Sequence, residues 1–282
     1  MRKGKPSRTA EFVALNRALG TLAPQVPGFA DPFAFQFLPK RGQKKVDRAR
    51  GGIANGARTS PYPFWQRGMG VFNQFRTVIL DRAIASAPPP EQLVILGAGL
   101  DSRAWRLDCL KDTVVFEVDH PSSQAPKRER SASVPYKAKD LRFVAMDFER
   151  DRLSPLLKSA GFDPGKRSFW LWEGVTMYLR PEQVSANLGA FAALSAPGSR
   201  IALTYLRKQN GRIPRSLFLA LLGEPVRSAF APAEIAEIAR SRGWRLINDT
   251  NIENWLQETP GLKLTRRLIG LQWLESIWVG EA

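Results

Sequence analysis

The chain has 282 residues, of which 44% are hydrophobic, and a formal net charge of +16. This length allows one large α/β domain, or a domain with a lid. The single cysteine, Cys109, excludes an internal disulfide, and with only one histidine in the chain we expect no zinc-type metal site. No apolar run approaches the roughly 18 residues of a membrane span, and no cleavable leader follows the basic start. We therefore expect a cytoplasmic protein with no membrane partner.

Basic residues are concentrated near the N-terminus, where residues 1–60 hold twelve Lys and Arg against Glu11, Asp31 and Asp47. Such a charge attracts anionic partners, among them a carboxylate substrate, an acidic protein tail, nucleic acid and anionic lipid. A solvated basic surface explains the same pattern without any partner. Because aromatic residues do not alternate with these charges, nucleic acid is the less favoured partner, and no obligate protein partner is indicated.

Residues 1–90 are expected to form an N-terminal helical extension or cap. A short helix is predicted over 10–19, and a proline-rich stretch follows it. Residues 51–63 are rich in turn formers and are expected to be a mobile loop. Apolar residues then recur at helical spacing over 69–87, and the three prolines 88–90 end that helix.

Strands and helices alternate over residues 91–282, which is typical of a parallel sheet with right-handed crossovers. The last two strands are expected to be an antiparallel pair at the edge. Residues 207–230 interrupt the alternation with several Gly and Pro, and we expect a lid there. The predicted strands are 93–96, 114–118, 143–145, 168–171, 200–206, 244–248 and 276–279, and the predicted helices are 153–159, 182–194 and 233–240.

The first of these strands runs directly into Gly97-Ala98-Gly99, where two glycines let the backbone turn sharply and approach a ligand. The second strand ends in Asp119, about 20 residues further on, where an acidic side chain binds a ribose in a βαβ nucleotide site. A tight structural turn is the alternative interpretation. Ser102 stands where a dinucleotide site has its third glycine, which disfavours a nicotinamide dehydrogenase.

Acidic residues at one edge of the predicted sheet further reduce the number of ligand classes that fit. Asp101, Asp119, Asp147 and Glu173 all come just after predicted strands, so a parallel sheet would bring them to the same rim. A pyrophosphate would be repelled by these carboxylates. S-adenosylmethionine has no phosphate and carries a sulfonium and an ammonium, so it suits an acidic rim.

The motifs together resemble the leucine carboxyl methyltransferase family, including its bacterial branch of S-adenosylmethionine-dependent methyltransferases. The likeness implies an α/β, class I methyltransferase (Rossmann-like) fold with a mostly parallel sheet, an antiparallel terminal pair and an N-terminal helical extension. The segment after Leu206 does not match the family's protein-substrate surface, so the acceptor does not carry over. The segments that carry the resemblance are Ser7–Ala10, Asp31–Ala34, Arg76–Thr77, Leu96–Leu107, Phe116–Pro121, Asp147–Phe148, Glu173–Leu179 and Pro197–Ser199.

S-adenosyl-L-methionine is the cofactor that the resemblance implies. Asp119 would then bind the ribose, Arg76 the methionine carboxylate and Glu173 the ammonium, while Arg17 matches a basic N-terminal residue of the family. The expected cofactor-binding residues are Arg76, Gly97, Ala98, Gly99, Asp119, His120, Asp147, Phe148 and Glu173.

Glu173 and Tyr178 are the candidate catalytic residues. Glu173 follows an aromatic strand, where a carboxylate needs a partner such as Arg76 or the cofactor ammonium. A tyrosine such as Tyr178 is more often a packed core aromatic than a catalyst, and His120, beside Pro121, is better placed near the purine than as a base.

The expected activity is methyl transfer to a carboxylate of a small anionic molecule. A carboxylate is ionised near pH 7 and needs no base, so alignment and desolvation would suffice. A hydroxyl acceptor would need a base, for which Glu173, His120 and Tyr178 are candidates. An amine or nucleobase methyltransferase is less favoured, because Glu173-Gly174-Val175 replaces the usual proline-rich run. A non-catalytic nucleic-acid-binding protein that retains the fold is the alternative from another class.

Overall fold

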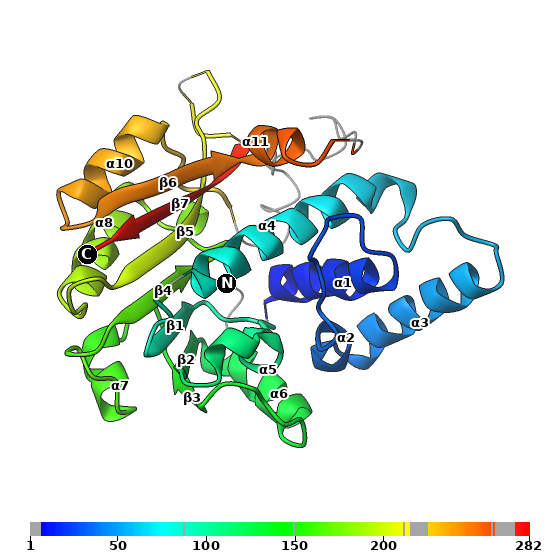
Figure 1. The fold of residues 1–282 in the computed structure, drawn as a ribbon, viewed down its shortest axis with the longest axis horizontal. Coiled ribbons are helices and arrows are strands. Elements are labelled where there is room, and N and C mark those ends of the chain that lie inside the picture. Colours follow the sequence, from blue (N-terminus) through cyan, green and yellow to red (C-terminus); the bar gives the residue numbers. More distant parts are fainter. Residues whose placement is uncertain are drawn as a thin grey trace.

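The computed structural model describes residues 7–86, 88–148, 150–210, 212–214, 225–260, 262 and 274–282. A seven-stranded sheet lies at its centre, with the strand order β3-β2-β1-β4-β5-β7-β6 (Figure 1). Every pair is parallel except the two that β7 makes, with β5 and with β6. The predicted mostly parallel sheet with its antiparallel terminal pair is confirmed. The strands are β1 (Gln92–Leu96), β2 (Val114–Asp119), β3 (Asp140–Ala145), β4 (Ser168–Trp172), β5 (Arg200–Leu206), β6 (Arg245–Asn251) and β7 (Glu275–Glu281).

Helices cover both faces of the sheet, and the alternation of side chains along each strand divides the core between them. On β1, Leu93 and Ile95 enter one apolar cluster, whereas Val94 and Leu96 enter the other. This explains why residues 93–96 form an unbroken apolar run and why every residue of β1 is buried. The helices are α1 (Arg8–Leu22), α2 (Ala34–Phe37), α3 (Lys40–Ala54), α4 (Arg67–Ala85), α5 (Arg103–Arg106), α6 (Pro121–Ser131), α7 (Leu153–Ser159), α8 (Pro181–Ala192), α10 (Pro232–Arg240) and α11 (Ile252–Gln257), with short 3-10 turns η1 (Phe64–Gln66), η2 (Asp108–Leu110) and η3 (Thr176–Tyr178).

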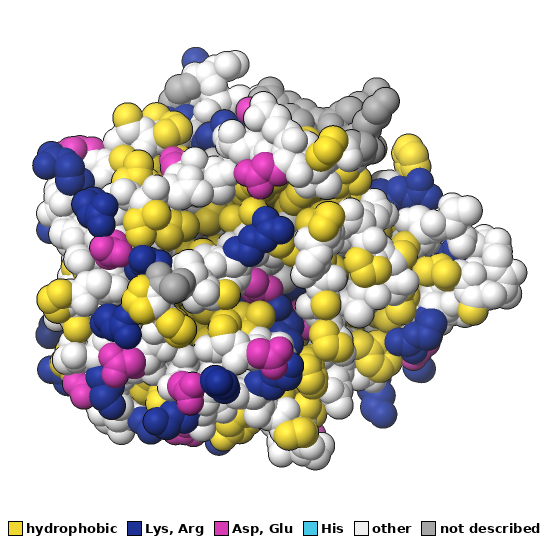
Figure 2. Space-filling model, in the orientation of Figure 1, with side chains coloured by type: hydrophobic (Ala, Val, Ile, Leu, Met, Phe, Trp, Pro, Cys, Tyr) yellow, Lys and Arg dark blue, Asp and Glu magenta, His cyan; other side chains and the backbone are white. Residues whose placement is uncertain are grey.

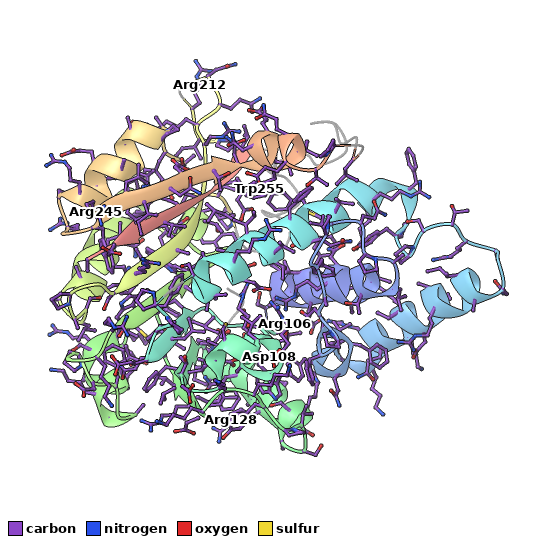
Figure 3. The ribbon with its side chains drawn as sticks, in the orientation of Figure 1. Arg106, Asp108, Arg128, Arg212, Arg245 and Trp255 are labelled. Atoms are coloured by element: carbon purple, nitrogen blue, oxygen red, sulfur yellow. The ribbon has the colours of Figure 1, made fainter. Side chains whose placement is uncertain are left out.

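The first cluster lies between the sheet and the helices α1, α4 and α11. Trp255 of α11, labelled in Figure 3, packs against Phe72 and Phe75 of α4, with ring centroids 5.9 and 6.0 Å apart. The second cluster joins the opposite face of the sheet to α7, α8 and α10 through Leu157, Leu188 and Ile235. Helices α1 and α4 are therefore part of the packing of the sheet, and α4 runs alongside it, whereas α3 lies away from the strands (Figure 1).

Helix α3 was not predicted from the sequence. Its exposed side is strongly basic, while Gly42, Val46 and Ala49 form a buried stripe against α1 and α2. These three positions follow helical spacing, so the helix is held by packing of one narrow face. Residues 51–54, expected to be part of a loop, form its last turn. In Figure 2, Lys and Arg side chains are visible along the lower edge of the region where α3 lies.

The predicted lid at 207–230 falls partly on residues that the structure does not describe, namely 211 and 215–224. Both described ends of the predicted lid are held by hydrogen bonds to other parts of the chain. The N–H of Arg207 donates to Leu274, and the Ser228 hydroxyl donates to the Thr176 carbonyl. Across the described residues, none of the helices has the length and apolar character needed to cross a membrane.

Candidate functional site

The glycine turn after β1 is tightly enclosed. Gly97 and Gly99 have φ values of +67° and +51°, a backbone region that favours glycine. A Cβ on Gly97 would lie 2.7 Å from a methyl of Val175, and one on Gly99 would lie 2.9 Å from the Cβ of Ala10 on α1. The turn therefore needs glycine both for its conformation and for the close approach of its neighbours.

Asp119 closes the other side of this turn from the end of β2. Its carboxylate accepts the N–H of Gly99 at 2.5 Å and the N–H of His120 at 2.6 Å. Burial raises the pKa of Asp119, and these two amide hydrogen bonds oppose the shift. A carboxylate has about four lone-pair sites, so two remain for hydroxyl donors of a ligand.

His120 caps the N-terminus of helix α6 through its ring nitrogen Nδ1, so this nitrogen is not free to face the glycine turn. Its Nδ1 accepts the N–H of Ser122 at 3.2 Å and lies 2.8 Å from the hydroxyl of that residue. The same chain segment therefore positions Asp119 and begins α6. This use of Nδ1 makes His120 a local structural residue and a poor candidate for a base at that nitrogen.

Arg76 of α4 and Glu173, just after β4, meet as the sequence analysis anticipated. The Nε of Arg76 lies 2.8 Å from Glu173, and its Nη1 donates to Glu275 at 2.9 Å. All three side chains are largely buried. Burial opposes the ionised form of Glu173, but the guanidiniums of Arg103 and Arg76 outweigh it and lower its pKa. Glu173 is therefore held as a carboxylate.

Arg103 is a residue that the sequence analysis missed. It is fully buried on α5, where its Nε donates to Asp81 at 2.8 Å and its Nη1 donates to Glu173 at 2.9 Å and also to Asp101. Nη2 has no hydrogen-bond partner among the described residues. Arg103 thus joins the glycine turn, α4 and the end of β4. The available signal was its position directly after the predicted acidic turn.

Two further arginines complete the charged network around the turn. Arg17 of α1 donates to the carbonyl of Leu100 at 2.6 Å and lies 3.2 Å from Asp31. Arg106, labelled in Figure 3 between α1 and α5, donates to Asp81 of α4 at 2.8 Å. Arg17 therefore lies beside the glycine turn.

The remaining expected site residues lie further along the rim. Asp147 follows β3 and its carboxylate is 3.7 Å from Arg150. Phe148 is unusual among large apolar residues in being 40% exposed. Tyr178 ends the turn η3 and is partly buried beside Met177.

The arrangement can hold a ligand with hydroxyls at one end and charged groups at the other. Asp119 offers acceptors beside a glycine turn, and the described cluster of buried guanidiniums and carboxylates offers partners for both a carboxylate and an ammonium. Most charged groups of this cluster are already paired, so a charged ligand either exchanges with an existing ion pair or uses Nη2 of Arg103, which has no hydrogen-bond partner among the described residues.

Sheet order and site together define the Rossmann-like fold of class I methyltransferases. A crystal structure of a methyltransferase from Thermobifida fusca, so named provisionally, has this fold, with a TM-score of 0.59 and 18% identity over 99% of this chain and 96% of that one. The chain belongs to the leucine carboxyl methyltransferase family, whose model matches residues 10–192.

Mycobacterial relatives support the same membership. A protein of Mycobacteroides abscessus is 31% identical over 256 residues, which cover 84% of this chain and 82% of the relative. One from Mycobacterium marinum is 36% identical over 203 residues, 69% of this chain and 61% of the relative. Both are named provisionally as S-adenosyl-L-methionine-dependent methyltransferases. The chain spans about three fifths of the length of the second relative.

Proposed function

We propose that this protein is an S-adenosyl-L-methionine-dependent methyltransferase that methylates a carboxylate oxygen of a small anionic molecule. The family membership supports the cofactor and the reaction class. The observation that carries the proposal is the buried Asp119 carboxylate, which is bonded to the N–H of Gly99 and lies at the same edge of the sheet as Glu173. Asp119 is the ribose acceptor in this proposal.

The other site residues take their places along the bound cofactor. Gly97, Ala98 and Gly99 pass close to it, and Arg76 and Glu173 hold its methionine carboxylate and ammonium. The exposed ring of Phe148 suits stacking on the adenine, with Asp147 and His120 nearby. We also propose that residues 1–90 act as a cap on a core of residues 91–282, since Ala10 and Arg17 of α1 lie against the glycine turn.

A carboxylate acceptor fits the charges of the site better than a hydroxyl. The bound cofactor supplies an electrophilic methyl group, and an ionised carboxylate attacks it without losing a proton. Glu173 has a lowered pKa and two guanidinium partners, so it is a weak base and acts by holding charge. Nδ1 of His120 is engaged in capping α6. Positioning and exclusion of water by this chain then account for catalysis.

Calorimetric titration with S-adenosylmethionine and with its demethylated product tests the cofactor. Wild-type protein is expected to bind both, and Asp119→Ala to bind them roughly tenfold or more weakly, because charge-assisted hydrogen bonds are worth about 1.5–3 kcal/mol. Asp108→Ala, at a highly exposed acidic residue seen in Figure 3, is the control. Unchanged affinity in folded Asp119→Ala would remove the ribose assignment.

The acceptor is tested by the chemistry of the product. A methyl ester releases methanol in mild alkali, whereas a methylated amine or a phenol ether does not. An alkali-stable product would replace the carboxylate with another acceptor and leave the methyltransferase proposal standing.

Nucleic-acid binding is the second candidate, favoured by the exposed basic side of α3. It carries Lys40, Arg41, Lys44, Lys45, Arg48 and Arg50. Salt-sensitive binding of DNA or RNA, with no heat on addition of S-adenosylmethionine, would favour this candidate over the enzyme.

A further inference from the structure

Glu275 is a buried carboxylate that the proposed reaction does not use. It is the first residue of β7, is 1% exposed, and lies outside residues 10–192 that match the family. Nη1 of Arg76 donates to both of its oxygens, at 2.9 and 3.3 Å. Position 275 pairs with Leu206 in the register of β5 and β7, so the sheet fixes where this carboxylate stands.

Arg76 is consequently occupied on two sides by acidic groups of the chain itself. Nε lies 2.8 Å from Glu173 in an ion pair without a well-aligned hydrogen bond, Nη1 donates to Glu275, and Nη2 donates to the side chain of Asn73 at 3.1 Å. All of the guanidinium nitrogens thus have neighbours within the described structure. A carboxylate arriving from a ligand must displace one of them or share a nitrogen, and two carboxylates at one guanidinium repel each other.

We propose that Glu275 competes with the methionine carboxylate of the cofactor for Arg76. The competition lowers the affinity for the cofactor, and it acts only on ligands that carry the amino-acid end. This inference rests on the proposed function, which places that carboxylate at Arg76. Among the described residues Glu275 forms an ion pair with Arg76 alone, whereas Glu173 is also held by Nη1 of Arg103 at 2.9 Å, so Glu275 is the acid that a ligand displaces more easily. Burial raises its pKa, whereas the pKa of Glu173 is lowered by Arg103 and Arg76. The Glu275 carboxylate is thus the less stable anion.

The competition predicts that a substitution in the binding site increases the affinity for the ligand, which is the opposite of the usual effect. Glu275→Gln keeps the shape and an acceptor oxygen but removes the negative charge. We expect S-adenosylhomocysteine to bind about tenfold more tightly to this variant, in line with the worth of one charge-assisted hydrogen bond. Affinity for 5′-methylthioadenosine, which shares the adenosine and lacks the amino-acid end, is expected to stay unchanged.

Glu281→Gln is the matched control. It lies at the other end of β7 and is partly exposed, paired with Arg200 and Arg245. Neither affinity should change in this variant. In the double variant Arg76→Met with Glu275→Gln, the gain from Glu275→Gln should vanish, because the group for which the two carboxylates compete is gone. Thermal unfolding of each variant reports whether it is folded.

The outcomes separate the inference from the proposed function. If wild-type protein binds neither ligand, the cofactor assignment fails. If wild-type protein binds both and Glu275→Gln binds S-adenosylhomocysteine equally or more weakly, Glu275 positions Arg76 and the competition is refuted. Equal tightening for both ligands also refutes it. Should Glu275→Gln fail to fold, Glu275→Asp decides, because its shorter side chain loosens the contact with Arg76 and is expected to tighten the same ligand by a smaller factor.

Discussion

Beneath Asp119, the ion pair of Glu117 and Lys127 lies entirely inside the protein. The two side chains are each 1% exposed and their charged atoms are 2.5 Å apart. Lys127 also lies over the Trp105 ring, with 5.2 Å from Nζ to the ring centroid. One oxygen of Glu117 has no hydrogen-bond partner among the described residues. The pair links α6 to β2, the strand that ends in Asp119, at a considerable desolvation cost.

This desolvation gives the stability of the protein a pH dependence. Burial raises the pKa of Glu117 to about 7 from an ordinary value of 4.5, although Lys127 opposes the shift. Between these two pH values the unfolded chain has released the proton and the folded chain still holds it. The folded state therefore binds more protons, and this contribution to stability is lost as pH rises from 4.5 to about 7.

Urea unfolding at several pH values tests this directly. The free energy of unfolding of wild type minus that of Glu117→Gln should fall across this window and then level off. Glu129→Gln, exposed on the same helix, is the control. A difference for Glu117→Gln that stays constant with pH would show that the buried carboxylate does not titrate in this range.

Contacts between individual side chains were the part of the site that was hardest to predict from the sequence. The spacing of Gly97, Gly99 and Asp119 identified a turn and an acceptor, because these features lie within one βαβ unit. Arg76 and Glu275 are 199 positions apart, and only the antiparallel entry of β7 beside β5 brings them together. Arg103 depends in the same way on three separate elements. Such contacts have no local pattern to predict them.

At the scale of elements, two glycines separate the two energetic costs of adding a side chain, which are backbone strain and steric clash. Gly97 lies in the turn between β1 and α5, and Gly56 lies just after α3. Gly97 and Gly56 have similar φ values, +67° and +74°. A Cβ at Gly56 would meet nothing within 4 Å, whereas one at Gly97 would lie 2.7 Å from Val175. Gly56→Ala therefore isolates the backbone strain, about 1–2 kcal/mol, and Gly97→Ala adds a clash.

We expect Gly97→Ala to lose more stability than Gly56→Ala and to weaken cofactor binding, while Gly56→Ala leaves binding unchanged. Chemical unfolding and calorimetric titration of the two variants measure both effects. Equal losses of stability would mean that Val175 moves aside at little cost, and unchanged binding in Gly97→Ala would mean that the turn does not approach the ligand closely.

Elements with a strong local pattern were predicted and the others were not. The seven strands came from apolar runs bounded by turns, and their observed ends differ from the predicted ones by a few residues. Helix α3 was missed because its composition is dominated by basic and small residues. Its buried stripe of Gly42, Val46 and Ala49 is too narrow to stand out in the sequence. The predicted lid cannot be compared over 215–224, which include Arg215, since those residues are not described.

At the scale of the whole molecule, the net charge of +16 is unevenly distributed around the site. The ionisable groups of the buried network largely pair with one another. On α3, by contrast, Lys44, Lys45 and Arg48 are exposed and have no ion pair among the described residues. The exposed basic residues are therefore the ones whose electrostatic field acts on ligands at a distance.

If this field gathers an anionic acceptor, kcat/KM should fall as ionic strength rises from 0.01 to 0.1 M, because the Debye length shrinks from about 30 to about 10 Å. Replacing Lys44, Lys45 and Arg48 by Gln should lower kcat/KM at 0.01 M and flatten its salt dependence. We expect kcat to stay unchanged, because α3 packs on α1 and α2 and lies away from the sheet (Figure 1). The control replaces Arg245 by Gln, an exposed arginine of β6 that Figure 3 labels on the far side from α3. A salt dependence that persists in the triple variant would assign the steering to other basic residues, and a wild-type kcat/KM that does not change with salt would exclude steering altogether.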